Sequence, residues 1–313
     1  MTAPTMLTEA APAAIDPITG PPRRGTQIKR PKAWPFALPA FIALALVLLY
    51  PLVYNVWISL HIDRLSAQDG EFVWFDNYAK VFQSGALLAT LGRTLVFTVG
   101  SLLLQFVVGL ASALALEAFP RAAKAIRPLL LTPWVMPGVA VAAIWLAILN
   151  PISGLANRLL GFAGVEPVQW LSTPELAMAS LIVVNTWKSA PYWMLMLSAG
   201  LKTVPKEVIE AAKVDGAPYL TIVWHVLLPA IRPVLATTSL LAFIWTFNYF
   251  DLVYLLTNGG PGDATSTLPF AIWESALKFN RFDQAAAYSV LSILLTGIAI
   301  ALYLRASRNQ ARQ

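Results

Sequence analysis

Long apolar stretches separated by short polar segments run through the chain. A helix needs about 20 mostly apolar residues to cross the hydrocarbon core of a bilayer. Six stretches reach that length and predict transmembrane helices at 35–60, 92–116, 129–149, 175–201, 233–257 and 284–304. Pro133, Pro137 and Gly138 interrupt the third stretch, so neighbouring helices must support the backbone groups that are freed there.

The composition agrees with a membrane location. Of the 313 residues, 58% are hydrophobic and 12% are charged, whereas an average soluble domain has roughly 25% charged residues. A soluble fold of this size exposes too much surface to hide so many apolar side chains. We therefore predict an all-α, polytopic membrane protein. The absence of Cys and the presence of only two His, His61 and His225, exclude disulfides, thiol nucleophiles and His-rich metal sites.

The net charge of +6 becomes informative when the basic residues are sorted by segment. Cytoplasmic segments of membrane proteins carry an excess of Lys and Arg. One side would hold Arg23, Arg24, Lys29, Arg30, Lys32, Arg121, Lys124, Arg127, Lys202, Lys206, Lys213, Arg232, Arg305, Arg308 and Arg312, and the other Arg64, Lys80, Arg158, Lys278 and Arg281. This bias predicts that both termini are cytoplasmic, and it explains the charge without a nucleic-acid partner.

We predict a transmembrane domain with a tail at each end. Residues 1–34 are rich in Ala, Pro and Thr and predict a disordered cytoplasmic tail. Residues 35–305 form the transmembrane domain, and 306–313 form a second cytoplasmic tail. The outer loops at 61–90 and 258–283 carry most of the extracytoplasmic charge.

The cytoplasmic stretch at 202–232 is long for a connector and carries helix signals. Pro205 suits the start of a helix, and Gly216 suits its end because glycine accepts a left-handed conformation. A second amphipathic run follows at 219–228. The pattern predicts a short helix–turn–helix beside the membrane, a shape that fits the groove of a partner protein.

The sequence EAAKVDGA at 210–217, followed by Leu228 and Pro229, resembles the EAA loop of ABC importer permease subunits. Val223 and Val226 stand where that pattern usually has Phe and Ile, and both changes keep apolar character. The resemblance implies that the residues coupling the chain to an ATPase subunit are Glu210, Ala211, Ala212, Asp215, Gly216, Leu228 and Pro229.

Five further segments, in the right order, resemble the carbohydrate branch of that family, the maltose and glycerol-phosphate permease type. They are Phe72 with Asn77 and Tyr78, LTPWVMP at 131–137, Asn150-Pro151 with Gly154 and Asn157, TNGGP at 257–261 with Ala264-Thr265, and the Ala-rich start of the last span at 285–290.

The resemblance implies a type I ABC importer permease fold in the cytoplasmic (inner) membrane of a bacterium or archaeon. The chain would form half of a sugar pathway that works by alternating access. A second homologous permease subunit, two ATPase subunits and an extracytoplasmic solute-binding protein would complete the importer. The chain would be no enzyme and would bind no cofactor, since the ATPase subunits would use ATP and Mg. The binding protein would dock on the loops at 61–90 and 258–283.

Polar residues within two predicted spans mark a candidate substrate site, because such residues are costly in a bilayer. Asn185, Lys188, Ser189 and Tyr192 share one helix face at spacings of 3, 4 and 7. The resemblance to maltose permeases assigns substrate contact to these residues and to Thr246, Asn248 and Tyr249. Hydrogen bonding between helices is the alternative role for each.

The sequence leaves alternatives for the role of Lys188, for the substrate and for the transporter class. Lys188 either attracts an anionic substrate or pairs with an acid such as Asp251 or one on the partner subunit. The substrate is a mono-, di- or oligosaccharide, with glycerol 3-phosphate as the alternative. An ion-coupled secondary transporter is a further alternative, but that class usually has more spans or an inverted repeat.

Overall fold

The computed structural model describes residues 34–62 and 70–310. It divides into two compact units, Met1–Leu49 and Tyr50–Gln313. In the first unit, the described part comprises helix α1 and the π-helical segment η1. The predicted disordered tail at 1–34 lies outside the described residues except for Trp34, where α1 begins. Apart from one antiparallel bridge between His61 and Phe72, the regular structure of the described residues is helical.

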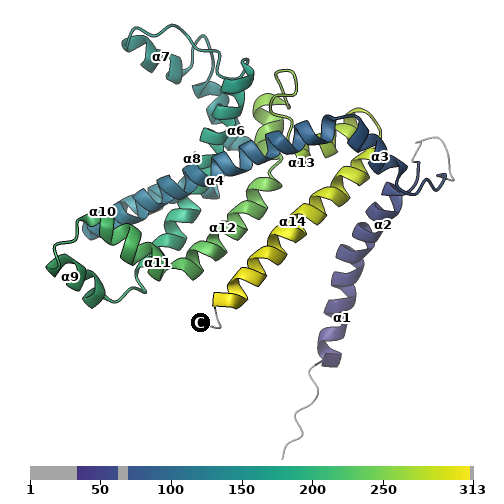
Figure 1. Cartoon of the computed structure of the whole chain (residues 1–313). Coiled ribbons are helices and arrows are strands. Elements are labelled where there is room, and N and C mark those ends of the chain that lie inside the picture. Colours follow the sequence, from purple (N-terminus) through teal and green to yellow (C-terminus); the bar gives the residue numbers. More distant parts are fainter. Residues whose placement is uncertain (1–33, 63–69, 311–313) are drawn as a thin grey trace, which may run out of the picture. The chain divides into compact units, whose positions relative to one another are not determined.

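The helices follow one another along the chain (Figure 1). They are α1 (Trp34–Leu44), η1 (Ala45–Leu49), α2 (Tyr50–Ser59), α3 (Asp76–Gln83), α4 (Ala86–Ala118), α5 (Pro120–Val135), α6 (Gly138–Ile148), α7 (Leu155–Phe162), α8 (Pro174–Leu201), α9 (Lys206–Val214), α10 (Tyr219–Ile222), η2 (Val223–Leu227), α11 (Leu228–Ala230), α12 (Arg232–Phe247), η3 (Val253–Thr257), α13 (Leu268–Trp273), η4 (Glu274–Lys278) and α14 (Phe282–Gln310). The last helix therefore extends through much of the predicted tail at 306–313.

Several helices have the length and composition of membrane spans. Three qualify singly, Leu38–Ser59, Ala86–Ala118 and Phe282–Ser307, and two bent helix pairs raise the number to five within the described residues. Helix α8 fills the fourth predicted span but is absent from this set. Its polar residues explain why, because they lower the mean hydropathy of a 28-residue helix that is long enough to cross a bilayer.

Helices α4 and α8 form the centre of the second unit and pack along each other. Close approach depends on glycine. A Cβ on Gly109 would collide with the Cβ of Trp193 and stand 3.1 Å from the Met194 backbone nitrogen. The indole of Trp193 donates a hydrogen bond of 3.1 Å to the buried Gln105 Oε1. Small residues at a helix interface are typical of membrane bundles, where packing drives association.

Two predicted spans are broken rather than continuous. The third consists of α5 and α6, which meet at an angle of 99° around Met136 and Pro137. Pro133 lies within α5, so the break is at Pro137 and not at Pro133. The prediction of one continuous helix at 233–257 was wrong. Helix α12 ends at Phe247, and a new helical turn begins at Asp251.

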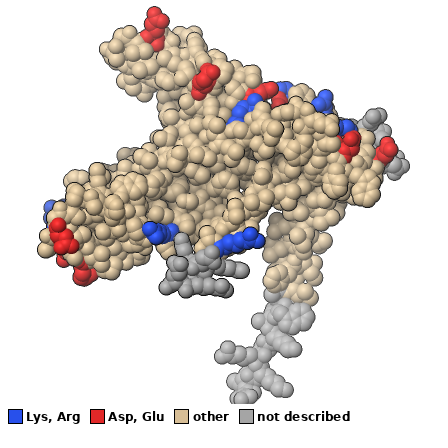
Figure 2. Space-filling view, viewed as in Figure 1, with Lys and Arg blue, Asp and Glu red and all other residues tan. Residues whose placement is uncertain are grey.

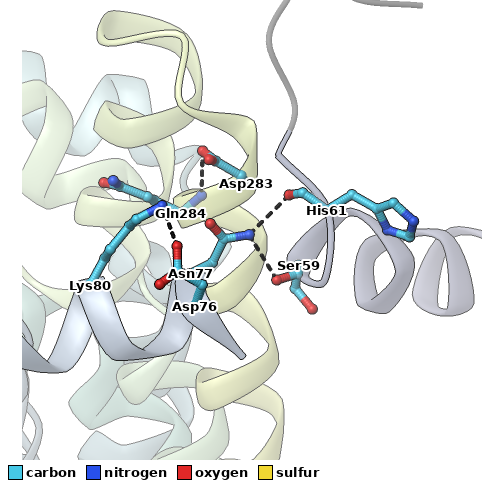
Figure 3. Close-up of polar contacts among 7 residues, drawn as sticks. All are labelled: Ser59, His61, Asp76, Asn77, Lys80, Asp283 and Gln284. Carbon is cyan, nitrogen blue, oxygen red and sulfur yellow. Dashed lines mark hydrogen bonds and ion pairs between the residues drawn. The ribbon is translucent and has the colours of Figure 1, made fainter. Parts of the chain in front are cut away.

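The polar residues after α2 close that helix. The buried Asn77 side chain donates hydrogen bonds of 3.0 Å and 2.9 Å to the carbonyl oxygens of Ser59 and His61 (Figure 3). The hydroxyl groups of Tyr78 and Ser59 lie 2.7 Å apart. Helix C-termini leave carbonyl groups without intrahelical partners. Asn77 satisfies two carbonyls at this end of α2, which gives the Asn-Tyr pair a structural role.

Candidate functional site

The predicted polar face of α8 forms as expected. Asn185 and Tyr192 are buried, with 1% and 3% of their surface exposed, and Lys188 and Ser189 are half-buried. The Ser189 hydroxyl donates a hydrogen bond of 3.4 Å to Asn185 Oδ1. These side chains therefore share one face of the helix, at the level where α5 gives way to α6.

Lys188 supports the break between α5 and α6. Its Nζ donates a hydrogen bond of 2.7 Å to the carbonyl oxygen of Met136, the residue that ends α5. Pro137 follows and has no N–H, so the chain turns away at this point. Within the described residues, Lys188 forms no ion pair with Asp251. The carboxylate of Asp251 instead lies against Gly138, where an added Cβ would stand 3.1 Å from its Oδ2.

Tyr192 lies between two aromatic rings. The ring of Trp245 on α12 contacts it edge-on at 4.9 Å between centroids, and the ring of Trp134 on α5 lies at 6.1 Å. Three spans therefore meet around one tyrosine. The sequence comparison did not assign substrate contact to Trp134 or Trp245, although Trp134 belongs to the LTPWVMP segment and Trp245 precedes Thr246.

Several buried polar atoms of α8 have no hydrogen-bond partner in the described part of the chain. They include Asn185 Nδ2, Thr186 Oγ1 and the hydroxyl of Tyr192. A buried polar group without a partner costs about 1–3 kcal/mol, and such groups are few in native proteins. Helix α4 carries further such atoms, on Thr98, Ser101 and Gln105, so the unpartnered polar groups gather on the two central helices.

The predicted substrate residues after α8 are Thr246, Asn248 and Tyr249, and they differ in their surroundings. Thr246 is buried and Tyr249 is half-buried, but the side chain of Asn248 is engaged elsewhere. Its Nδ2 donates to the Ile244 carbonyl at 2.9 Å, and its Oδ1 accepts a 3.5 Å hydrogen bond from Ser292 on α14. Asn248 thus links α12 to the last helix. None of the four cavities described for this structure is lined by the predicted substrate residues.

The coupling segment, residues 202–232, has the predicted helix–turn–helix form. Helix α9 ends at Val214, and Gly216 has a φ of +76°, as predicted from its position. The Gly216 N–H donates to the Lys213 carbonyl at 3.0 Å, and the Ala217 N–H donates to the Ala212 carbonyl at 3.1 Å. This pair of bonds is a Schellman motif, which satisfies the last carbonyls of a helix.

The predicted coupling residues fall into outward and inward groups. Glu210, Ala211, Asp215 and Gly216 are exposed. Ala212 and Leu228 instead pack in the apolar cluster between α4, α8 and the coupling segment, with Pro229 half-buried beside them. Large apolar side chains on the same segment face outward: Val208, Val214, Tyr219, Leu220 and Trp224. Figure 2 shows acidic side chains gathered at the α9 end of the molecule.

Two of the segments that resemble the carbohydrate branch, the one with Asn157 and TNGGP at 257–261, stabilise loops through hydrogen bonds. The buried Asn157 side chain bonds to Pro151 and Val168 and accepts a 2.9 Å hydrogen bond from the Trp170 indole. In the TNGGP segment, the Thr265 hydroxyl donates to the Gly260 carbonyl at 2.8 Å. Gly259 has a φ of +78°, and a Cβ there would collide with Phe270. These residues shape the loops and take no part in the α8 face.

Residues 105–310 match the family described as "Binding-protein-dependent transport system inner membrane component". This match covers the second part of α4, all of α8, the coupling segment and the last helix. The chain belongs to this family of membrane permease components. The EAA-like segment and the α8 face both lie within the matched range.

Individual relatives and a solved structure agree with this family assignment. The chain is 32% identical to the trehalose/maltose transport system permease protein MalF of Thermococcus litoralis, over 87% of this chain and 92% of that protein. It is 30% identical to the sulfoquinovosyl glycerol transport system permease protein SmoG of Agrobacterium fabrum, over 87% of this chain and 89% of that protein. A bacterial ABC transporter that imports the acidic polysaccharide alginate shares the fold, with a TM-score of 0.73, 24% identity and coverage of 89% and 94%. The predicted ABC importer permease fold is thereby confirmed.

Proposed function

We propose that the chain is the permease subunit of an ATP-driven importer of mono-, di- or oligosaccharides. Its membership of the binding-protein-dependent family is the observation that carries this proposal. Relatives at 30–32% identity are named for the transport of trehalose or maltose and of sulfoquinovosyl glycerol. The buried hydroxyl and amide groups of α8, set between tryptophan rings, suit a sugar, whose hydroxyl groups need partners and whose ring faces are apolar.

In this proposal the chain crosses the inner membrane six times, with α8 as one crossing and both termini in the cytoplasm. Substrate contact is assigned to Asn185, Ser189, Tyr192, Thr246 and Tyr249. Lys188 and Asn248, which were also predicted, instead support the helices through hydrogen bonds to the Met136 carbonyl and to Ile244 and Ser292. A second homologous permease subunit supplies the other wall of the pathway. The solute-binding protein docks on the outer loops, and a related alginate transporter structure contains a sugar-bound periplasmic protein.

The coupling segment would bind an ATPase subunit through its exposed residues. Glu210 would meet a basic group of the ATPase, and the small side chain of Ala211 would allow close approach. Exposed tyrosine and tryptophan on the same segment suit a protein interface. Buried Leu228 and half-buried Ala212 would transmit the motion, because they attach the segment to the α4–α8 core. ATP-driven closure of the ATPase pair would then move the spans as rigid bodies.

Purification of the tagged chain with its neighbouring gene products tests the proposal. We expect an ATPase subunit to co-purify and its ATP hydrolysis to rise when the sugar-loaded binding protein is added. A well-folded preparation without any ATPase subunit would contradict it. A thermal-shift panel of sugars and sugar phosphates on the binding protein would then identify the substrate class and separate sugars from glycerol 3-phosphate.

A further inference from the structure

We propose that the chain binds the headgroup of an anionic phospholipid in a basic cavity between α4, α5 and the end of α8. The cavity has a volume of about 490 Å³. It is formed by Leu116, Glu117, Pro120, Ala123, Lys124, Arg127, Pro128, Leu131 and Lys202. We call the cavity lined by these residues the headgroup cavity.

The charge of the headgroup cavity calls for an anion. Lys124, Arg127 and Lys202 face one carboxylate, that of Glu117. In the described part of the chain, none of the three basic residues forms an ion pair, since the two pairs found are Lys80–Asp76 and Lys278–Glu274. The lining therefore has a net charge of +2, and a bound anion would reduce the remaining repulsion among the cations.

The start of α5 adds to this positive field. The helix begins at Pro120, and the preceding residue, Phe119, has no side chain that can cap it. The first N–H groups of a helix lack intrahelical partners and carry a partial positive charge. They favour a phosphate at this end of the helix.

The position of the headgroup cavity favours a lipid over a soluble anion. It lies where the apolar span Ala86–Ala118 ends and α5 begins, so its mouth is at the boundary between hydrocarbon and water. Its other walls are apolar, and the nearby Phe119, Ile126 and Leu129 are exposed. A phospholipid matches both parts, with a phosphate for the basic groups and acyl chains for the apolar surface. Basic pockets at the ends of membrane helices bind such headgroups.

Native mass spectrometry of the purified full-length chain in a neutral detergent tests this inference. The probes are phosphatidylglycerol and phosphatidylcholine with identical acyl chains. We expect phosphatidylglycerol to bind at least about tenfold more tightly. Each basic residue near a membrane surface contributes about fivefold in affinity, so a Lys124→Gln/Arg127→Gln/Lys202→Gln variant should lose most of this preference.

Two single variants serve as matched controls. Arg121→Gln removes the same charge from α5 but lies outside the headgroup cavity, so the preference should persist. Glu117→Gln removes the opposing carboxylate and should tighten phosphatidylglycerol binding. Equal binding of the two lipids, or a loss in the Arg121→Gln variant as large as in the triple variant, would overturn the proposal. Thermal unfolding verifies that each variant is folded.

Two further measurements distinguish a lipid headgroup from a soluble phosphate and from a contact with another subunit. Soluble glycerol phosphate should not displace phosphatidylglycerol at equal concentration, because it lacks acyl chains, and displacement would overturn the lipid as occupant. The assembled importer should retain the lipid. If the assembled importer excludes it, the basic residues belong to a subunit interface and the proposal fails. No arm measures transport, so these outcomes are independent of the proposed sugar substrate.

Discussion

The coupling segment and the polar face of α8 differ in which groups they leave without a partner. In the coupling segment the backbone at the end of α9 is satisfied by its own turn, but large apolar side chains such as Leu220 and Trp224 face outward. On α8 the Nδ2 atom of Asn185 and the hydroxyl of Tyr192 are buried, but they have no partner in the described part of the chain.

This difference indicates two kinds of ligand. An exposed apolar surface on a rigid turn suits another protein, whereas buried polar atoms suit a small polar molecule. The two regions are joined by one apolar cluster that contains Tyr192, Leu228 and Ile231. Packed side chains therefore connect the coupling segment with the α8 face.

The largest expected loss of stability comes from separating α4 and α8, because the coupling segment and the α8 face both pack on these helices. A Gly109→Val variant should be destabilised by about 3 kcal/mol or more, because backbone atoms of α8 cannot yield to the added methyl groups. The thermal midpoint of the purified chain measures this. Gly92→Val on the same helix is the control, since no atom lies within 4 Å of a Cβ there. Equal midpoints for the two variants would contradict the close packing.

The next effect concerns the broken third span. Lys188→Met leaves the Met136 carbonyl without its donor, which should cost about 1–3 kcal/mol of stability. Uptake of neutral and phosphorylated substrates should fall by the same factor, because the lysine supports the backbone rather than the substrate. Lys188→Arg keeps a donor and should restore most of the activity. A loss confined to phosphorylated substrates would instead show that Lys188 contacts the anion.

A smaller effect should appear in the coupling segment alone. Gly216→Val forces a β-branched residue into a left-handed conformation, at a local cost of about 1–2 kcal/mol. We expect normal membrane insertion and continued ATP hydrolysis but loss of uptake. Gly216→Asn should behave almost as the natural chain, since asparagine accepts this conformation. Normal transport by the valine variant would refute the role of this turn in coupling.

The smallest loss of stability should come from Tyr192→Phe. The buried hydroxyl has no partner among the described residues and the ring contacts remain, so the free energy of unfolding should not fall and should rise by up to about 1–3 kcal/mol. Uptake should nevertheless decrease if the hydroxyl bonds to substrate. Tyr192→Leu, which also removes the aromatic packing, is the comparison for stability. Unchanged uptake by the phenylalanine variant would leave Tyr192 a packing role only.

Prediction from sequence succeeded where the signal was local. The end of α9 at Gly216 and the shared face of Asn185, Lys188 and Tyr192 follow from glycine chemistry and helix periodicity. It failed at 233–257, where apolar composition concealed the end of α12 at Phe247. The role of Lys188 was also missed, because its partner is a backbone carbonyl 52 residues away, which no side-chain pattern reveals.

Composition, residue spacing and turn chemistry are enough to predict an apolar, helical permease with an EAA-like segment, because these signals act over a few residues. The partners of the polar side chains depend instead on how the helices pack. Asn248 bonds to α14 and Lys188 to the carbonyl at the end of α5, while Asn185 Nδ2 and the Tyr192 hydroxyl have no partner in the described part of the chain. Hydrogen bonding between helices depends on how the spans bend and pack, and close packing fixes that only in three dimensions.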